Sequence, residues 1–510
     1  MIRISTLLCP CVAAVFLLST PALAQDAQIQ APSHSAQPRN AAKVQELQRI
    51  IAEQQRQLDA QQEQLEAQKK MLQELQQQVQ GLAECAPPPQ APQTTQQAME
   101  PAQAHEAAKH TATSAEKEER EWEEAMFEKL LRDPRTWPEG MKRPDGWIGV
   151  PGRKTDVRFG GFVQVNFIHD FQNAGFPYGE FITSQIAVPT DDTSNTEFDP
   201  RTSRLTFESR TPGARDSYYN TFFSIDFAGN AGESLIQPRL RQAYLSGIGL
   251  LSGAAFTVGQ AWTTFLDLSV WPDIFDLEGP NAMTGLRQVL VRYAFTLDEE
   301  KHLIADVALE QPETGVQNGN GLRNLPDAVA RIRWQQDWGH LTGALLGRQL
   351  VAEGTSGTGE DSAFGWGLSL SGELKVPDSK DNLRFQVQGG SGVGRYVFDL
   401  GSAPTPQDAV YNDATAQLSP LDEFGAFGAY QHWWADKWRS TLVVGYLRMN
   451  NLTEQPPDEL KQTIYAVGNL IYRLYDRLDF GLEYTWGQRT NKDDQTGYAN
   501  RLMFAVKYPF

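Results

Sequence analysis

Residues 158–167 read RFGGFVQVNF, and this stretch decides the fold. Its apolar positions recur at every second residue from Phe159 to Phe167, whereas Arg158, Gln164 and Asn166 fall on the opposite face. A period of two is typical of a β-strand with one apolar and one polar face. A transmembrane barrel requires such strands, because lipid wets its outside and water its inside.

The same alternation recurs to the end of the chain. We count sixteen runs, which begin near residues 157, 202, 218, 238, 254, 287, 301, 327, 339, 363, 382, 423, 438, 463, 477 and 499. Tight joints at 298–301, 337–339, 435–437 and 475–476 alternate with long loops at 170–201, 263–286, 311–326, 392–422 and 450–462. This asymmetry is typical of the turns and loops of outer-membrane barrels. The pattern predicts an all-β transmembrane barrel of about sixteen antiparallel strands over 157–510, and a soluble sandwich or propeller is the structural alternative.

Composition narrows the class of protein. The 510 residues include 45 Lys+Arg and 63 Asp+Glu, which give a formal net charge of −18, and 40% are hydrophobic. The acidic balance argues against nucleic-acid binding, and the modest hydrophobic content excludes a polytopic helical membrane protein. The chain nevertheless contains 12 Trp, 15 Tyr and 25 Phe. Many aromatic residues with little net hydrophobicity suit alternating strands better than a thick core.

The first 24 residues read as a cleaved signal peptide. Arg3 precedes an apolar run over 7–18, and Ala22-Leu23-Ala24 offers a small-residue cleavage site before Gln25. The mature chain then keeps only Cys85 and cannot form an internal disulfide. We therefore expect export to the bacterial outer membrane, with a flexible N-terminus over 25–43.

A heptad repeat follows over 44–85. Its a positions are Val44, Ile51, Leu58, Leu65, Leu72 and Val79, and its d positions are Leu47, Gln54, Gln61, Gln68, Leu75 and Leu82. The repeat predicts a periplasmic α-helical coiled coil, and a disordered Gln-rich tract is the alternative. Gln at d suits the wider core of a trimer better than a dimer. Residues 86–156 read as a Pro/Gln-rich linker with a short helix around Trp122 and Leu130.

Several segments carry a family resemblance. They are Gly146-Trp147-Ile148, Phe159-Gly160-Gly161-Phe162, Arg239-Leu240-Arg241-Gln242-Ala243-Tyr244, and Val258-Gly259-Gln260-Ala261-Trp262-Thr263-Thr264-Phe265, continuing through Asp276-Leu277-Glu278-Gly279-Pro280-Asn281 to Arg287-Gln288. On these segments the chain resembles the DcaP family of trimeric outer-membrane porins. The resemblance covers nearly the whole mature chain and implies a homotrimer in outer-membrane lipid that takes up dicarboxylates and other small anions.

The alternation also predicts which charged side chains line the pore. With apolar residues outward, the inward phase carries a set of arginines, namely Arg158, Arg204, Arg210, Arg239, Arg241, Arg292, Arg331 and Arg333, and Arg348 and Arg384 share it. Inward acids accompany them, among them Glu208, Asp226, Asp306 and Glu310. Guanidinium groups along a narrow aqueous path attract anions and bind carboxylates through two hydrogen bonds. The pattern therefore indicates an anion path.

The segment 263–286 is long for a loop and partly apolar. We expect it to fold into the barrel and form the constriction, where Asp267, Asp273, Asp276 and Glu278 face inward arginines and set a transverse field. The alternative is that these acids only pair with the arginines and neutralise them.

Signals for catalysis and cofactors are poor. The seven histidines show no ligand spacing, so we expect no metal and no cofactor. A diffusion porin for small anions, not an enzyme, is the favoured function. The alternatives are an unselective general porin, a structural protein whose coiled coil tethers a periplasmic or cell-wall partner, and an outer-membrane hydrolase.

Overall fold

A computed structural model describes residues 146–510, except 176–178, 214–216, 230–235, 249–253, 299, 301, 356, 358 and 476. The expected signal peptide, coiled coil and linker helix lie outside these residues. No helix in the described part of the chain has the length and apolar character needed to cross a membrane.

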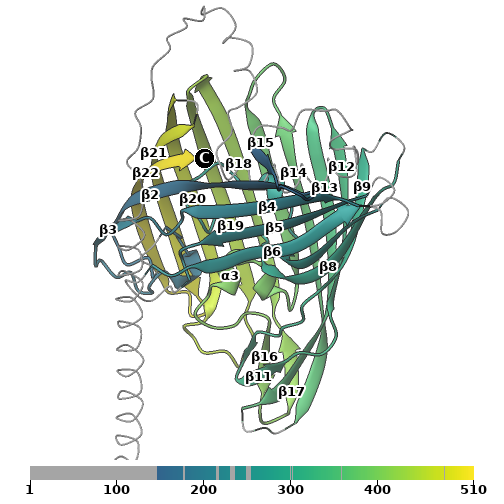
Figure 1. The fold of residues 1–510 in the computed structure, drawn as a ribbon. Helices are drawn as coiled ribbons and strands as arrows, with labels where there is room; N and C mark the ends of the chain where they lie inside the picture. Colours follow the sequence, from purple (N-terminus) through teal and green to yellow (C-terminus); the bar gives the residue numbers. More distant parts are fainter. Residues whose placement is uncertain are drawn as a thin grey trace, which may run out of the picture. The chain divides into compact units, whose positions relative to one another are not determined.

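Sixteen antiparallel strands close into a barrel (Figure 1). They are β2 (Asp156–Asp170), β4 (Arg204–Pro212), β5 (Tyr218–Asp226), β6 (Arg239–Ile248), β7 (Ala255–Trp262), β8 (Arg287–Thr296), β9 (Leu303–Glu310), β12 (Asp327–Gln336), β13 (Gly339–Gly354), β14 (Glu360–Lys375), β15 (Asn382–Ser391), β18 (Asp422–Ala435), β19 (Trp438–Asn450), β20 (Leu460–Tyr475), β21 (Leu478–Asn491) and β22 (Thr496–Pro509). The last strand pairs with the first, with Phe162 opposite Pro509 and Asp170 opposite Arg501. The predicted count is confirmed, and each predicted start lies within three residues of an observed one.

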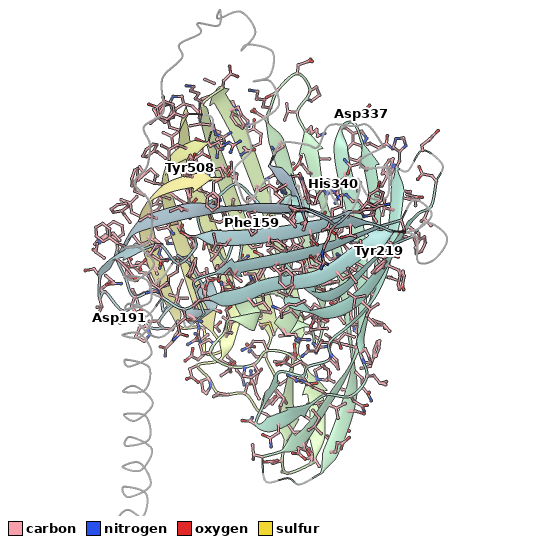
Figure 2. The ribbon with its side chains drawn as sticks, viewed as in Figure 1. Phe159, Asp191, Tyr219, Asp337, His340 and Tyr508 are labelled. Carbon is pink, nitrogen blue, oxygen red and sulfur yellow. The ribbon has the colours of Figure 1, made fainter. Side chains whose placement is uncertain are left out.

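The two faces of the strands differ as lipid and water require. Large apolar side chains such as Phe159, Val289, Leu368 and Leu442 are exposed on the outside, where lipid would cover them. Polar and charged side chains of the alternate positions are buried in the interior. Asp337, in a short turn, and Asp191, in a long loop, lie toward opposite ends of the barrel (Figure 2).

The long loops carry structure of their own. The loop before β4 contains η2 (Thr183–Gln185) and β3 (Asn195–Asp199), and β3 pairs with the same strand, β2, as β4 does. The short strands β10 (Val316–Gln317), β16 (Ala409–Asn412) and β17 (Gln417–Pro420) form a small separate sheet. β11 (Gly319–Leu322) extends the barrel beside β13. This lobe projects from the long-loop end of the barrel (Figure 1). At the other end, β1 (Trp147–Gly149) pairs with the start of β2.

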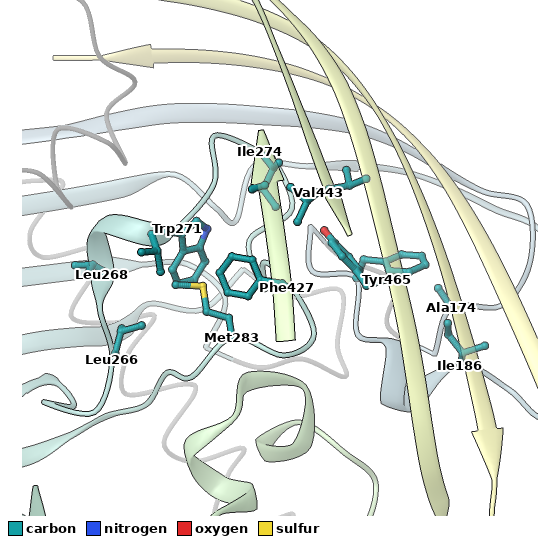
Figure 3. Packing of buried hydrophobic residues seen from close by; sticks show 14 of the residues in the cluster. Ala174, Ile186, Leu266, Leu268, Trp271, Ile274, Met283, Phe427, Val443 and Tyr465 are labelled. Atoms are coloured by element: carbon teal, nitrogen blue, oxygen red, sulfur yellow. The ribbon is translucent and has the colours of Figure 1, made fainter. Parts of the chain in front are cut away.

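The loop that joins β7 to β8, residues 263–286, lies inside the barrel; we call it the infolded loop. Every residue from 263 to 285 is buried except Ser269, in the 3-10 helix η3 (Leu268–Val270), which is half-buried. Trp271 and Met283 of the loop pack in one apolar cluster with Phe427 of β18 and Tyr465 of β20 (Figure 3). An apolar loop can therefore rest inside a polar barrel because part of the inner wall is itself apolar.

Inward-facing glycines make room for the loop. A Cβ atom on Gly481 of β21 would lie 1.9 Å from the ring of Phe275, and one on Gly445 of β19 would lie 2.2 Å from the side-chain oxygen of Asn281. Both distances are far inside van der Waals contact. Only glycine permits this approach of the loop to the wall.

Candidate functional site

The polar contacts of the infolded loop run to one part of the barrel, the strands β9 to β21, which we call the anchoring wall. Glu483 of β21 accepts hydrogen bonds from the backbone N–H groups of Phe275 and Asp276 at 2.7 and 2.8 Å. Thr264 N–H donates to Glu310 of β9 at 2.7 Å, and Asn281 donates to Thr463 of β20 at 2.8 Å. The loop is thus hydrogen-bonded to this wall at several points along its length, while Phe275 also packs against Ile168 of β2 and Trp271 against Trp262 of β7.

Two of the four predicted loop acids form ion pairs with the anchoring wall. Asp273 lies 2.6 Å from Arg439 of β19. Asp267 lies 2.9 Å from His340 and 3.8 Å from Arg333. The geometry of these two carboxylates therefore fits the alternative, in which the loop acids only pair with basic side chains and neutralise them.

The other two loop acids have neutral partners. Asp276 accepts hydrogen bonds from the hydroxyl group of Tyr465 at 2.7 Å and from the N–H of Phe181 at 2.9 Å, and Glu278 accepts one from Ser402 at 3.0 Å. Within residues 146–510 as described, neither makes an ion pair. Both sit on the stretch of the loop that interacts with the loop before β4.

Two further loops reach into the interior, which the sequence did not predict. Asp399 of α3 (Phe398–Gly401) accepts hydrogen bonds from Thr183 Oγ1 at 2.8 Å and Ser184 N–H at 3.1 Å. Its third partner is Thr463 of the barrel wall, at 3.3 Å. The buried carboxylate thereby ties the loop before β4 to the loop that carries η4 (Gly394–Tyr396) and α3.

Arg239 and Arg241 lie opposite the anchoring wall, on β6. Both reach Asp226 at the end of β5, with Arg239 Nε and Nη2 donating at 2.9 and 2.7 Å and Arg241 Nη1 at 2.8 Å. Arg239 also lies 3.6 Å from Glu180 of the loop before β4, and Glu278 interacts with it electrostatically. The wall formed by β2 and β4 to β8, which we call the arginine wall, therefore faces the acidic stretch of the infolded loop.

Three further predicted arginines of this wall lie over aromatic rings. The guanidinium carbons of Arg158 and Arg210 lie 5.6 and 5.3 Å from the ring of Trp147, and that of Arg204 lies 5.2 Å from Phe162. Glu208 lies 2.8 Å from Arg158. Flat aromatic supports hold guanidinium groups in a fixed orientation through cation–π attraction.

The remaining predicted arginines lie at or near the loop. Arg331 Nε donates to Asp306 at 2.9 Å, and its Nη1 donates to the carbonyl oxygen of Leu266 at 2.8 Å. Arg333 donates to Ser269 at 3.1 Å. Arg292, on β8, interacts electrostatically with Arg331 and Asp306. Arg331 and Arg333 thus fasten the infolded loop to the anchoring wall.

Several charged residues of the interior were not among the predicted pore-lining residues. Arg287 shares its phase with the outward Val289 and Val291, yet its guanidinium lies 4.9 Å from the ring of Trp262, which belongs to the apolar cluster inside the barrel. Arg439, Arg473 and Arg501 of the later strands are also buried and ion-paired. Their inward phase was visible in the sequence, so the same alternation could have found these three.

A Ser–His–Asp grouping in the interior lacks the geometry of a hydrolase. His340 Nε2 lies 3.0 Å from Ser269 Oγ and 2.9 Å from Asp267 Oδ2. A catalytic relay uses the two different ring nitrogens for these two contacts. His340, labelled in Figure 2, is instead one of the attachments of the infolded loop.

A second grouping resembles a metal site. Asp298, Glu300 and His302 bring ligand atoms within 4.8 Å of one another on the turn between β8 and β9. Both carboxylate oxygens of Asp298 already accept backbone N–H groups, those of His302 and Leu303. This carboxylate therefore stabilises the turn.

The closed barrel of sixteen strands, with apolar exterior and loops packed into a polar lumen, defines an outer-membrane channel of the porin type. The family model for the DcaP outer membrane protein matches residues 146–510. The chain belongs to that family.

The fold is shared with a solved structure. The outer-membrane channel DcaP of Acinetobacter baumannii is similar at 20% identity and a TM-score of 0.61, over 71% of this chain and 99% of that one. An anion-selective porin from Comamonas acidovorans is 10% identical, with a TM-score of 0.48 over 70% of this chain and 100% of that one. No curated protein matches the chain in sequence.

Proposed function

We propose that this outer-membrane porin passes small anions, dicarboxylates among them, by diffusion along the arginine wall. The observation that carries the proposal is the one-sided attachment of the infolded loop. The hydrogen bonds that Phe275 and Asn281 make to barrel strands run to the anchoring wall, as do the glycines under the loop, whereas Arg239 and Arg241 are held by Asp226 on the other wall. The proposed path lies between these arginines and the stretch of the loop around Asp276 and Glu278.

The physical basis is electrostatic. Guanidinium groups in a narrow, partly desolvated passage lower the free energy of an anion there and orient a carboxylate through paired hydrogen bonds. Arginines on one side and carboxylates on the other also set a field across the passage. Diffusion down a gradient needs no energy source, and the size limit is set by the loop.

The zero-current potential in a planar bilayer under a salt gradient tests the proposal. The wild-type channel is expected to prefer anions. The triple variant Asp226→Asn, Arg239→Gln, Arg241→Gln removes one net positive charge without leaving Asp226 buried and unpaired, and its anion preference is expected to fall. Arg448→Gln changes an exposed arginine of β19 and serves as the control with unchanged preference.

Other outcomes separate the alternatives. A wild-type channel without ion preference identifies a general porin, and cation preference overturns the anion path. Absence of any channel activity favours a structural tether. Deleting residues 25–117 then decides, since a tether loses its phenotype whereas a porin keeps its conductance.

The proposal also covers the oligomeric state of the porin. The heptads over 44–85 favour three-stranded association in the periplasm, which fits a homotrimer of barrels in outer-membrane lipid. Cross-linking of the full chain in membranes tests the stoichiometry, and a dimer would contradict it.

A further inference from the structure

Within the described part of the chain, Glu423, the second residue of β18, is a buried carboxyl group that makes no ion pair. It is 5% exposed, and its Oε2 atom accepts a hydrogen bond from Gln388 Nε2 of the neighbouring strand β15 at 3.0 Å. Its other oxygen, Oε1, is buried and has no hydrogen-bond partner among the described residues. The same is true of the amide oxygen of Gln388. One pair of side chains thus carries two buried acceptor oxygens, and a proton between them would satisfy both.

The surroundings of Glu423 are apolar. Leu421 lies two residues before it and Met449 lies opposite it on β19, and both pack in one cluster with Leu400 of α3. The charged side chains of the surrounding elements are exposed or have partners of their own; they are Asp422 on its own strand, Arg384 on β15, Arg448 on β19, Arg348 on β13, and Arg395, Asp399 and Asp408 on the loop that joins β15 to β18. None of them interacts electrostatically with the carboxyl group of Glu423. A carboxylate without a counter-ion is costly in such surroundings, so the neutral, protonated form is favoured.

Protonation would complete the hydrogen bonding of both side chains. A protonated carboxyl group has one O–H donor and keeps a carbonyl acceptor, and an amide offers the complementary N–H donor and carbonyl acceptor. Each unpartnered oxygen is attached to the same carbon as one atom of the existing hydrogen bond, so the two oxygens are within reach of each other. The pair can therefore close a ring of two hydrogen bonds, with Gln388 Nε2 donating to Oε2 and the O–H of Glu423 donating to the amide oxygen.

The pair lies beside the end of the infolded loop. A Cβ atom on Gly425 of β18 would lie 2.6 Å from Gln388 Nε2 and 2.9 Å from the Cβ atom of Ala282 in the loop. The preceding inward residue of β15, Gln386, accepts a hydrogen bond from the N–H of Thr284 at 3.2 Å and donates to its hydroxyl group at 2.5 Å. The two glutamines therefore support the end of the loop, and the position of Gln388 depends on its carboxyl partner.

We propose that Glu423 carries a proton at neutral pH and shares it with Gln388, and that this pair is a pH-dependent lock on the end of the infolded loop. In alkaline solution the carboxyl group releases its proton to the solvent and becomes an acceptor only, so its contact with the amide oxygen changes from a hydrogen bond to repulsion. Water must then enter the cluster around Leu421 and Met449 to solvate the charge. The loop end beside Gln388 loses its fixed support, and the current through the channel becomes less steady.

The unfolding temperature of the purified full chain, measured from pH 4 to pH 9, tests the proton. If the folded carboxyl group stays protonated while the unfolded one ionises near its usual pKa of about 4.3, the folded state loses stability as the pH rises above that value. Glu423→Gln replaces the acid by an uncharged amide of the same shape, which can form the same two hydrogen bonds with Gln388. This variant should unfold with wild type at pH 4 and a few degrees above it at pH 8. Glu454→Gln, in an exposed loop position, is the control and should show no such pH-dependent difference.

Two further measurements test the protonated group and the lock directly. The infrared spectrum of the wild-type protein at pH 7 should contain a carbonyl band of a protonated carboxyl group that fades in alkaline solution and is absent from Glu423→Gln. In a planar bilayer, the noise of the open-channel current should rise in wild type between pH 7 and pH 10. The noise should stay constant over this range in Glu423→Gln, whose conductance also shows that the barrel has folded.

Three outcomes would overturn the proposal. Equal pH dependence of the unfolding temperature in wild type and Glu423→Gln, with no difference in the carbonyl bands, would show that Glu423 is ionised at neutral pH. Stabilisation of wild type, but not of Glu423→Gln, when choline chloride is exchanged for sodium chloride would place a sodium ion between the two oxygens instead of a proton. The infrared band with equal current noise in both proteins would confirm the proton and overturn the lock. The inference does not depend on the anion path, so an absence of ion preference leaves it standing.

Discussion

Arg439 shows how single residues hold the lumen in place. It is 2% exposed, and it bridges Asp273 of the infolded loop at 2.6 Å and Asp479 of β21 at 2.8 Å. Asp479 is also held by Arg473 at 2.8 Å. The desolvation cost of such buried charges offsets much of their mutual attraction, but removing one partner leaves the others uncompensated.

Arg439→Met should therefore be strongly destabilising, by about 3–5 kcal/mol, the usual cost of breaking a buried ion pair. The measurement is the temperature at which the barrel loses its folded mobility on an SDS gel. Arg439→Met combined with Asp273→Asn should recover part of the loss, since the loop carboxylate is no longer left charged. Equal unfolding temperatures for wild type and Arg439→Met would show that the bridge contributes nothing.

Asp381 provides a pH test outside the membrane, in the turn before β15. Burial opposes its ionisation, but hydrogen bonds from the Trp433 N–H at 2.8 Å, from His432 and from Tyr430 outweigh burial and lower the pKa of Asp381 to about 2. A carboxyl group whose pKa is lowered by folding stabilises the folded state above its unfolded pKa of about 3.9. That contribution is lost as the pH falls from about 4 to 2.

Asp381→Asn should accordingly unfold at a lower temperature than wild type at pH 7, with the difference shrinking between pH 4 and pH 2. Unfolding temperatures measured across this range check the sign. A difference that stays constant down to pH 2 would mean that the ionised carboxylate is not the source of the effect.

The infolded loop is the element on which function depends, and its position is set by small residues in the wall. Gly481 lies two residues before Glu483, which accepts the N–H groups of Phe275 and Asp276. A side chain at 481 must displace the ring of Phe275. Because Phe275 is also enclosed by Ile168, Ile471 and Met503 of the barrel wall, its ring and the loop backbone have to move toward the lumen.

Gly481→Val should therefore lower single-channel conductance by narrowing the passage. Gly428→Ala is the matched control, because a Cβ atom at this exposed position of β18 would have nothing within 4 Å. Equal conductance in wild type and Gly481→Val would place the passage elsewhere in the lumen.

The elements differ in how far the sequence could predict them. Strand positions are encoded locally, by alternation within each run, and were predicted closely. The hydrogen bond between Thr183 and Asp399 joins residues more than 200 positions apart. No local sequence pattern in either segment indicates that the two segments meet. The inward position of Arg287 was not predicted, because it depends on Trp262 of the neighbouring strand. Alternation alone assigns Arg287 to the lipid side.

At the scale of the whole molecule, the predicted coiled coil and the barrel are expected to have separable roles. Deleting residues 44–85 should leave conductance and ion preference nearly unchanged, because every residue proposed for the path lies in the barrel. The number of channels that open together in one insertion event should fall if the coiled coil holds copies together. Loss of conductance itself would instead show that the predicted coiled coil contributes to the pore.

The strands are of very unequal length around the barrel. β4, β5, β6 and β7 have 8 to 10 residues, whereas β13, β14 and β20 have 16. With a tilt near 40°, the former span roughly 23 Å and the latter roughly 40 Å. The shorter strands are about as tall as the apolar band of an outer-membrane barrel, roughly 25 Å, whereas the end of β13 also pairs with β11 in the projecting lobe. Where the membrane is thicker than the wall formed by the short strands, lipid beside this wall has to thin, and facing the short-strand walls of neighbouring copies toward each other would relieve this hydrophobic mismatch. The membrane itself would then favour a particular orientation of each barrel toward its neighbours, before any specific contact between them forms.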